Sequence, residues 1–178
     1  MQQLFDVITR LTSALARAKI EYRIVGGVAV FLHVYERDPL AARSTRDLDV
    51  AVDRRDLDRI IESARPSGFE YRHAAGVDML VDARDPRARS AVHLIFIGER
   101  VRPDYLEPVP GFSTPTRTSE GVLIAPPADL VKMKLTSFRL HDRVHLKDLD
   151  AVGIITPDIE ATLSPALLDR LRAVRAEE

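Results

Sequence analysis

The sequence has no cysteine, no long apolar run and no excess of charge of either sign, its formal net charge being −1. Without cysteine, the chain forms neither disulfides nor thiolate metal sites. A net charge near zero gives no overall basic field that would recruit nucleic acid, so such binding would need a local patch. No apolar run approaches the roughly 18 residues of a membrane span, and the N-terminus is unlike a signal peptide. We therefore expect a cytoplasmic protein with no membrane partner.

The length and composition are those of one globular domain. The chain has 178 residues, of which 46% are hydrophobic and 30% charged, which is enough for a proper core. Apolar residues recur at helical spacing over 3–19, 28–34, 54–65, 127–140 and 165–175, and β-prone runs cover 23–25, 47–52, 69–73, 77–81, 91–97 and 122–125. This alternation predicts an α/β (α+β) fold with a small mixed sheet of about five strands flanked by helices. A short helical section, about 126–178, ends the chain.

A strand, a glycine turn and a helix follow one another between residues 23 and 34. Gly26 and Gly27 end the β-prone run with backbone freedom that other residues lack. The first N–H groups of the helix that Val28 opens have no partner within the helix, and the helix dipole is positive there. The stretch therefore predicts an anion site, although a Gly-Gly pair by itself is usually only a turn.

Two carboxylates open the next β-prone run, 47–52. Strand alternation places Leu48 and Val50 on one face and Asp47 and Asp49 on the other. The two aspartates are then about 6.6 Å apart along the backbone and point the same way. Together they suit a hard cation such as Mg²⁺, which takes its other ligands from water and phosphate. The alternative is a solvated strand face without a metal.

The order of these two patterns resembles the nucleotidyltransferase superfamily, of which DNA polymerase beta is a member. Residues 26–29 (GGVA) and 45–49 (TRDLD) are most similar to the AbiEii-like, MNT-type branch of bacterial toxin–antitoxin nucleotidyltransferases. The resemblance implies a single nucleotidyltransferase-like domain over 1–178. It also implies that the glycines hold the triphosphate of an NTP and that the aspartates hold Mg²⁺ or Mn²⁺.

Residues beside these motifs join the expected site. The resemblance places Thr45 and Arg46 at the nucleotide, although Arg46, like Arg43, is equally explained as a solvated surface arginine. The family usually has a third carboxylate on the strand over 91–97, where this sequence has His93. His93 is either a substituted metal ligand or base, or a core histidine with a satisfied hydrogen bond. Asp78 is the weaker candidate for the missing carboxylate.

The helix expected over 127–140 carries the second candidate site. Lys134 falls in the middle of its apolar arc, where an unpaired ammonium is too costly, so we expect Asp47, Asp49 or a bound phosphate as its partner. A lysine with its stem packed and its head in water is the alternative. By resemblance, Lys134 acts on the triphosphate, and Asp148 orients or activates the acceptor. A structural ion pair of Asp148 with a nearby arginine, Arg139 or Arg143, is equally open.

These observations predict an Mg²⁺-dependent nucleotidyltransferase. It would transfer a nucleoside monophosphate from an NTP to the 3′ end of a tRNA or to a protein, within a toxin–antitoxin system. The rival is a catalytically degenerate binding protein, an antitoxin or sensor, which the missing third carboxylate favours. A third option is transfer to a small aminoglycoside-like alcohol, which predicts an acidic acceptor cleft.

Overall fold

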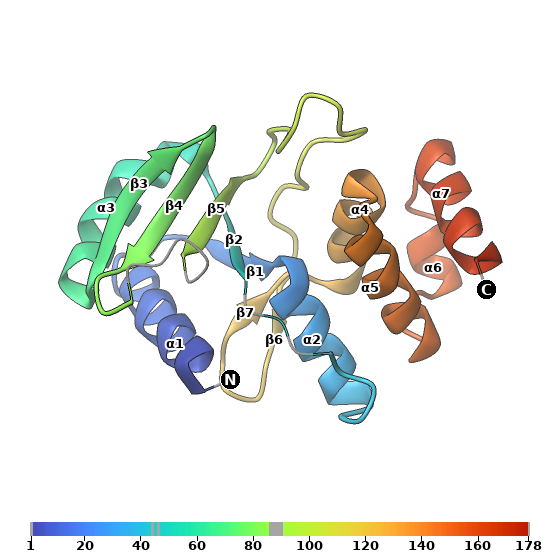
Figure 1. The fold of residues 1–178 in the computed structure, drawn as a ribbon, viewed down its shortest axis with the longest axis horizontal. Coiled ribbons are helices and arrows are strands. Elements are labelled where there is room, and N and C mark those ends of the chain that lie inside the picture. The colour runs from blue at the N-terminus through green and yellow to red at the C-terminus, as the bar shows by residue number, and fades with distance from the viewer. Residues whose placement is uncertain (1, 44, 46, 86–90, 178) are drawn as a thin grey trace.

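The computed structural model describes residues 2–43, 45, 47–85 and 91–177. Figure 1 shows a twisted sheet with α1 and α3 at one end of the molecule and α4 to α7 gathered at the other. The helices are α1 Gln2–Arg17, α2 Gly26–Arg37, α3 Leu57–Ala64, α4 Pro127–Ser137, α5 Leu140–Ala151, α6 Pro157–Glu160 and α7 Pro165–Ala176. The strands are β1 Tyr22–Val25, β2 Leu48–Val52, β3 Phe69–Ala74, β4 Val77–Asp82, β5 Val92–Phe96, β6 Thr116–Arg117 and β7 Leu123–Ile124.

The sheet is mixed, as the sequence predicts. In the described part of the chain it has seven strands in the order β3-β4-β5-β2-β1-β7-β6, against the expected five or so. The pairs β2–β5 and β1–β7 are parallel, and the others are antiparallel. β2 and β1, which carry the two predicted motifs, therefore lie side by side in the middle of the sheet, with Val25 opposite Asp49.

The two faces of the sheet pack against different apolar clusters. Val50 and Val52 of β2 are fully buried in the main core together with Leu11 of α1 and Ile60 of α3. The opposite face carries a small apolar cluster of Val25, Ala51 and Ala125, against which Ile95, Ile97 and Met133 pack. The alternation predicted for β2 is confirmed, because Asp49 shares this second face with Ala51. None of the described helices has the length and apolar content that a membrane crossing requires.

The helix predicted over 127–140 is wrong at its C-terminus. α4 ends at Ser137, because Phe138 has a left-handed backbone conformation with φ 50°. A separate helix, α5, starts at Leu140, and its first turn is capped by Asp142, whose carboxylate accepts from the backbone N–H of Arg139. The sequence shows no glycine or proline at this corner, so the usual signals for a break are missing.

Two other helix boundaries have residues that local preferences favour there. Asp53 caps the short 3-10 turn Arg54–Asp56 by accepting from the backbone N–H of Arg55. After α3, the 3-10 turn Arg65–Ser67 ends at Gly68, which is left-handed with φ 84°.

Truncation of Leu146 tests the contribution of α5 to the core. Leu146 is fully buried in the main cluster, so Leu146→Ala removes apolar contacts and leaves a cavity. We expect the free energy of unfolding to fall by about 2–5 kcal/mol in urea titrations. Val144→Ala on the exposed side of the same helix is the matched control and should change it by no more than about 0.5 kcal/mol. Equal effects of the two substitutions would contradict the packing of α5.

Candidate active site

The turn between β1 and α2 is built for glycine. Gly26 has φ +67°, and a Cβ on it would collide with the carboxylate of Asp49. A Cβ on Gly27 would lie 2.8 Å from the Thr45 hydroxyl oxygen and 3.4 Å from Cε1 of His145. Within the described residues, no side chain caps the N-terminus of α2. The carboxylate and the hydroxyl thus lie directly against a turn whose helix N–H groups remain free to bind an anion.

The predicted aspartates lie at the start of β2, beside the turn. Asp47 is exposed and precedes the strand, and Asp49 is half-buried within it. Asp49 lies opposite His93 of β5 in the sheet register, and its Oδ1 is 3.1 Å from His93 Nδ1. This hydrogen bond to Asp49 raises the pKa of His93 above its ordinary value, although burial opposes it. The ring nitrogen that faces Asp49 therefore acts as a donor whenever His93 is protonated.

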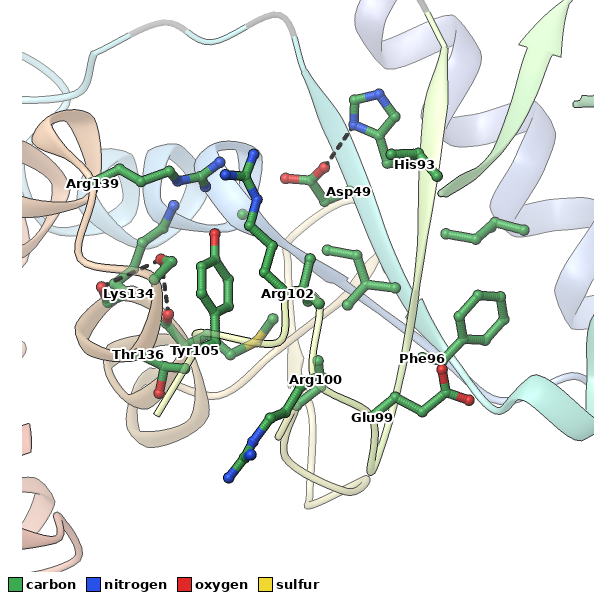
Figure 2. Close-up of a pocket in the computed structure, with 18 of the residues that line it drawn as sticks. Asp49, His93, Phe96, Glu99, Arg100, Arg102, Tyr105, Lys134, Thr136 and Arg139 are labelled. Carbon is green, nitrogen blue, oxygen red and sulfur yellow. Dashed lines mark hydrogen bonds and ion pairs between the residues drawn. The ribbon is translucent and has the colours of Figure 1, made fainter. Parts of the chain in front are cut away.

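A cleft of about 790 Å³ joins these groups to the C-terminal helices. The sequence-predicted residues that line it are Gly26, Gly27, Thr45, Asp47, Asp49, Asp78, His93 and Lys134. Its size suits a small-molecule ligand such as a nucleotide. Figure 2 shows Asp49 and His93 on their two strands, with Lys134, Arg139, Arg102 and Tyr105 extending toward the same space from the other side. Arg46 lies outside the described residues, so its predicted place at the nucleotide is not described.

Lys134 is buried, as predicted, but its partner differs from the expected one. Its side chain is 6% exposed, and Nζ donates to Oδ1 of Asp142 at 2.8 Å rather than to Asp47 or Asp49. Burial alone would raise the pKa of Asp142, but the charge of Lys134 and its hydrogen-bond donors outweigh burial and hold it well below the usual range. Asp142 therefore stays ionised in the interior.

Asp148 lies outside the cleft lining in the described structure. Both oxygens of its carboxylate are 3.0 Å from Nε of Arg43. The partners that the sequence suggested for it bind elsewhere, since Arg139 pairs with Asp142 and Arg143 pairs with Glu177. Asp148 thus forms an ion pair with an arginine, as one of the two alternatives predicted, but the arginine is Arg43 and not Arg139 or Arg143.

Asp78 belongs to a different face of the sheet. It pairs in register with Leu94, whose side chain points away from the aspartate pair. Its carboxylate accepts from the Tyr71 hydroxyl at 2.5 Å and is 2.8 Å from Nδ1 of His73, and Arg54 adds an ion pair at 3.6 Å. Asp78 lines the far end of the cleft and does not complete a set with Asp47 and Asp49.

Several lining residues were missed by the sequence analysis. Arg102 and Tyr105 come from the irregular segment between β5 and β6, and Arg139 and His145 from the corner and helix that follow α4. Arg102 forms no ion pair with any residue that the structure describes. The segment contains several proline residues, which favour an irregular chain but give no signal of where it lies.

The carboxylates of β2 suit a divalent metal ion with few protein ligands. Among the described residues, no three His, Cys, Asp or Glu side chains are grouped in a way that could hold a metal. Mg²⁺ commonly binds one or two carboxylates and completes its shell with water and substrate phosphates. Asp47 and Asp49 supply such a pair, and the Asp49 carboxylate lies directly against the glycine turn.

A pair of glycine substitutions tests the close approach at the turn. Gly26→Ala requires both a strained φ and displacement of Asp49, whereas Gly153→Ala at φ +70° meets no atom within 4 Å. We expect Gly153→Ala to cost about 1–2 kcal/mol of unfolding free energy from backbone strain alone. Gly26→Ala should cost clearly more in the same urea titrations. Equal losses would show that Asp49 does not pack against the turn.

His145 predicts a pH dependence of stability. Burial, together with the charge of Lys134, lowers its pKa to about 4 from an ordinary value of 6.5. Between these pH values, His145 is protonated in the unfolded chain and neutral in the folded one. Its effect is therefore a free energy of unfolding that rises with pH from about 4 to 6.5. Comparing urea titrations of the native protein and His145→Gln should show the slope reduced in the variant, by on the order of 2–3 kcal/mol across this range. Parallel curves would contradict the burial of this ring.

No protein-family model matches the sequence, and no curated protein matches it significantly. Among solved structures, the chain is similar to an antigenic nucleotidyltransferase-like protein from Paracoccidioides brasiliensis, with a TM-score of 0.61 and 18% sequence identity over 98% of this chain and 88% of that one. Similarity to ANT(2″)-Ia in complex with adenylyl-2″-tobramycin is lower, with a TM-score of 0.49 and 13% identity over 99% of this chain and 98% of that one.

The Paracoccidioides likeness identifies the fold. At 18% identity, this likeness concerns the fold and not the substrate. The similarity to ANT(2″)-Ia, with a TM-score of 0.49, adds nothing to it. The resemblance to the AbiEii-like branch stays a prediction. The mixed sheet with flanking helices is the nucleotidyltransferase fold that the sequence predicts.

Proposed function

We propose that this protein transfers a nucleoside monophosphate from an NTP to an acceptor hydroxyl. The observation that carries the proposal is the convergence of three groups on one cleft: the glycine turn of α2, the Asp47–Asp49 pair, and the cations Lys134 and Arg139. An anion-binding turn, a carboxylate pair and fixed cations are what phosphoryl-group transfer needs, since its catalysis is mainly positioning and electrostatics.

The reaction assigns a task to each group. The acceptor oxygen attacks the α-phosphorus, the bond to the β-phosphate oxygen breaks, and pyrophosphate leaves with the bonding electrons. The N–H groups that open α2 bind and orient phosphate oxygens, and Lys134 and Arg139 neutralise the charge that develops on the leaving group. His93 lines the cleft, and in its neutral form it would accept the proton of the hydroxyl.

A metal ion would bind at the aspartate pair. Asp47 and Asp49 would hold Mg²⁺, or Mn²⁺ in its place, and the ion would supply neutralisation of the phosphate charge. His93, which the sequence analysis named as a third ligand, already hydrogen-bonds Asp49, so we assign it the proton rather than the metal. Asp148, in its ion pair with Arg43, has no part in the proposal.

The surroundings of the cleft bear on the acceptor. Arg100 and Arg102 are exposed on the segment beside it and favour an acceptor that carries phosphates, such as the 3′ end of a tRNA, over a protein side chain. Nucleotidyl transfer to either acceptor is consistent with the proposed role in a toxin–antitoxin system. A small amino-alcohol would instead use the carboxylates of the far end, but Asp78 and Glu99 there are paired with Arg54.

A degenerate binding protein is the second candidate. It is favoured by the lack, among the described residues, of a group of three acidic or imidazole side chains that could hold a metal, and by the hydrogen bond that His93 makes to Asp49. Such a protein would bind the nucleotide without transferring it.

A labelling assay tests the proposal. The purified protein is incubated with Mg²⁺, each α-³²P-labelled NTP and either total tRNA or cell lysate, alongside Asp49→Asn and Asp53→Asn. Asp53 lies just beyond the same strand and caps a turn, a role that asparagine also fills, so this control should retain activity. We expect label transfer by the native protein and at least about a 100-fold loss in Asp49→Asn.

The outcomes separate the two candidates. Binding of an NTP without transfer would support the binding protein, and equal transfer by Asp49→Asn would exclude the proposed site.

A further inference from the structure

Asp142 is a fully buried carboxylate at the corner between α4 and α5. Its Oδ1 accepts from Lys134 Nζ at 2.8 Å, and its Oδ2 accepts from the Ser137 hydroxyl at 2.7 Å. Oδ2 also accepts from the backbone N–H of Arg139 at 3.2 Å and from its Nε at 2.8 Å. With 0% of its surface exposed, the carboxylate is held entirely by these protein donors. Such a charge is tolerable inside a protein only because it is paired and hydrogen-bonded.

The corner has more positive than negative charge. One carboxylate faces two cations, Lys134 and Arg139, which gives the group a net charge of +1. His141 Nε2 lies 3.7 Å from the same carboxylate and adds to this charge only if it is protonated. Both cations line the cleft, whereas Asp142 does not. Figure 2 shows the Lys134 ammonium and the Arg139 guanidinium extending to the same side of the cleft as Arg102. The excess positive charge therefore faces the same space as the Asp49 carboxylate, which itself acts on Arg139. A phosphate bound together with a metal ion at Asp49 would complete the balance of charge.

We propose that Asp142 is a positioning residue for the phosphates of the bound NTP. Its negative charge keeps Lys134 and Arg139 side by side at the wall of the cleft, so that both contact the triphosphate. The inference rests on the proposed function, because that function places an NTP in this cleft. It assigns to the triphosphate a subsite on the α4–α5 corner, and His145 of α5 lies beside the glycine turn.

The corner has supports that do not depend on the charge of Asp142. The ring of Phe138, the left-handed residue, lies under the guanidinium groups of Arg143 and Arg170, at 5.6 Å and 4.9 Å from its centroid. Arg170 of α7 also donates to the carbonyls of Leu135 and Thr136 at the end of α4, at 2.7 Å and 2.8 Å. We therefore expect the isosteric change Asp142→Asn, which keeps the shape and one acceptor oxygen, to fold.

The test compares ligands that differ in their phosphates. Calorimetric titrations measure the binding of each NTP, its nucleoside and inorganic tripolyphosphate to the native protein, Asp142→Asn and Asp150→Asn. Asp150 is the matched control, because it is on the same helix and pairs with Arg175, outside the cleft lining. We expect Asp142→Asn to weaken NTP and tripolyphosphate binding about 10- to 100-fold and to leave nucleoside binding unchanged. Asp150→Asn should match the native protein for all three ligands.

Each other outcome is decisive. Equal NTP affinity of Asp142→Asn and the native protein would overturn the inference, and so would a parallel loss of nucleoside and NTP binding, which indicates a change of cleft shape. A native protein that binds no NTP would refute the proposed function and the inference with it. If Asp142→Asn does not fold, Arg139→Gln removes the half-exposed cation alone. It should weaken NTP but not nucleoside binding, and an unchanged NTP affinity would overturn the inference.

Discussion

The contact between the Asp49 carboxylate and Gly26 is the constraint on which the site depends. β1 and β2 pair so that Val25 lies opposite Asp49, and the chain then turns sharply into α2. Only a glycine at φ +67° leaves the space that the carboxylate fills. The strand that presents the acidic pair and the helix that presents free N–H groups are thereby held in direct contact. A metal and a phosphate could then share one location, with neither bound to a flexible loop.

The electrostatic design separates the charges across the cleft. Asp47 and Asp49 form an acidic side on β2, and Lys134 and Arg139 form a basic side on the α4–α5 corner. An anion paired with a divalent cation is the ligand that satisfies both sides together. The side chains that carry these charges come from regular elements and their ends, so the proposed reaction would need little reorganisation of them as charge develops. Asp142, buried behind the basic side, is the counter-ion that makes this arrangement tolerable in the absence of ligand.

The C-terminal helices serve the site through their packing. Leu135 of α4, Leu146 and Leu149 of α5 and Leu167 of α7 are fully buried in the main core, which ties these helices to the sheet. The left-handed Phe138 reverses the chain between α4 and α5 and is covered by two arginines. A left-handed conformation costs free energy at a residue other than glycine, and the surrounding contacts hold Phe138 in it.

Features of the protein that depend on local pattern could be predicted from the sequence. Strand alternation predicts that Asp49 and Val50 lie on opposite faces of the sheet, and the Gly-Gly pair predicts the turn. Helical periodicity predicts that Lys134 points inward. These rules act over a few residues, and the fold obeyed them.

Contacts between residues that are distant in the sequence could not be predicted in this way. The partner of Lys134 is Asp142 because Phe138 breaks the helix without a glycine or proline, and no periodicity predicts that break. Asp148 meets Arg43, which is 105 residues away in the chain, and Arg102 reaches the cleft from an irregular segment. Side-chain partners of this kind depend on how whole elements pack, and packing is a property of the complete core rather than of any local stretch.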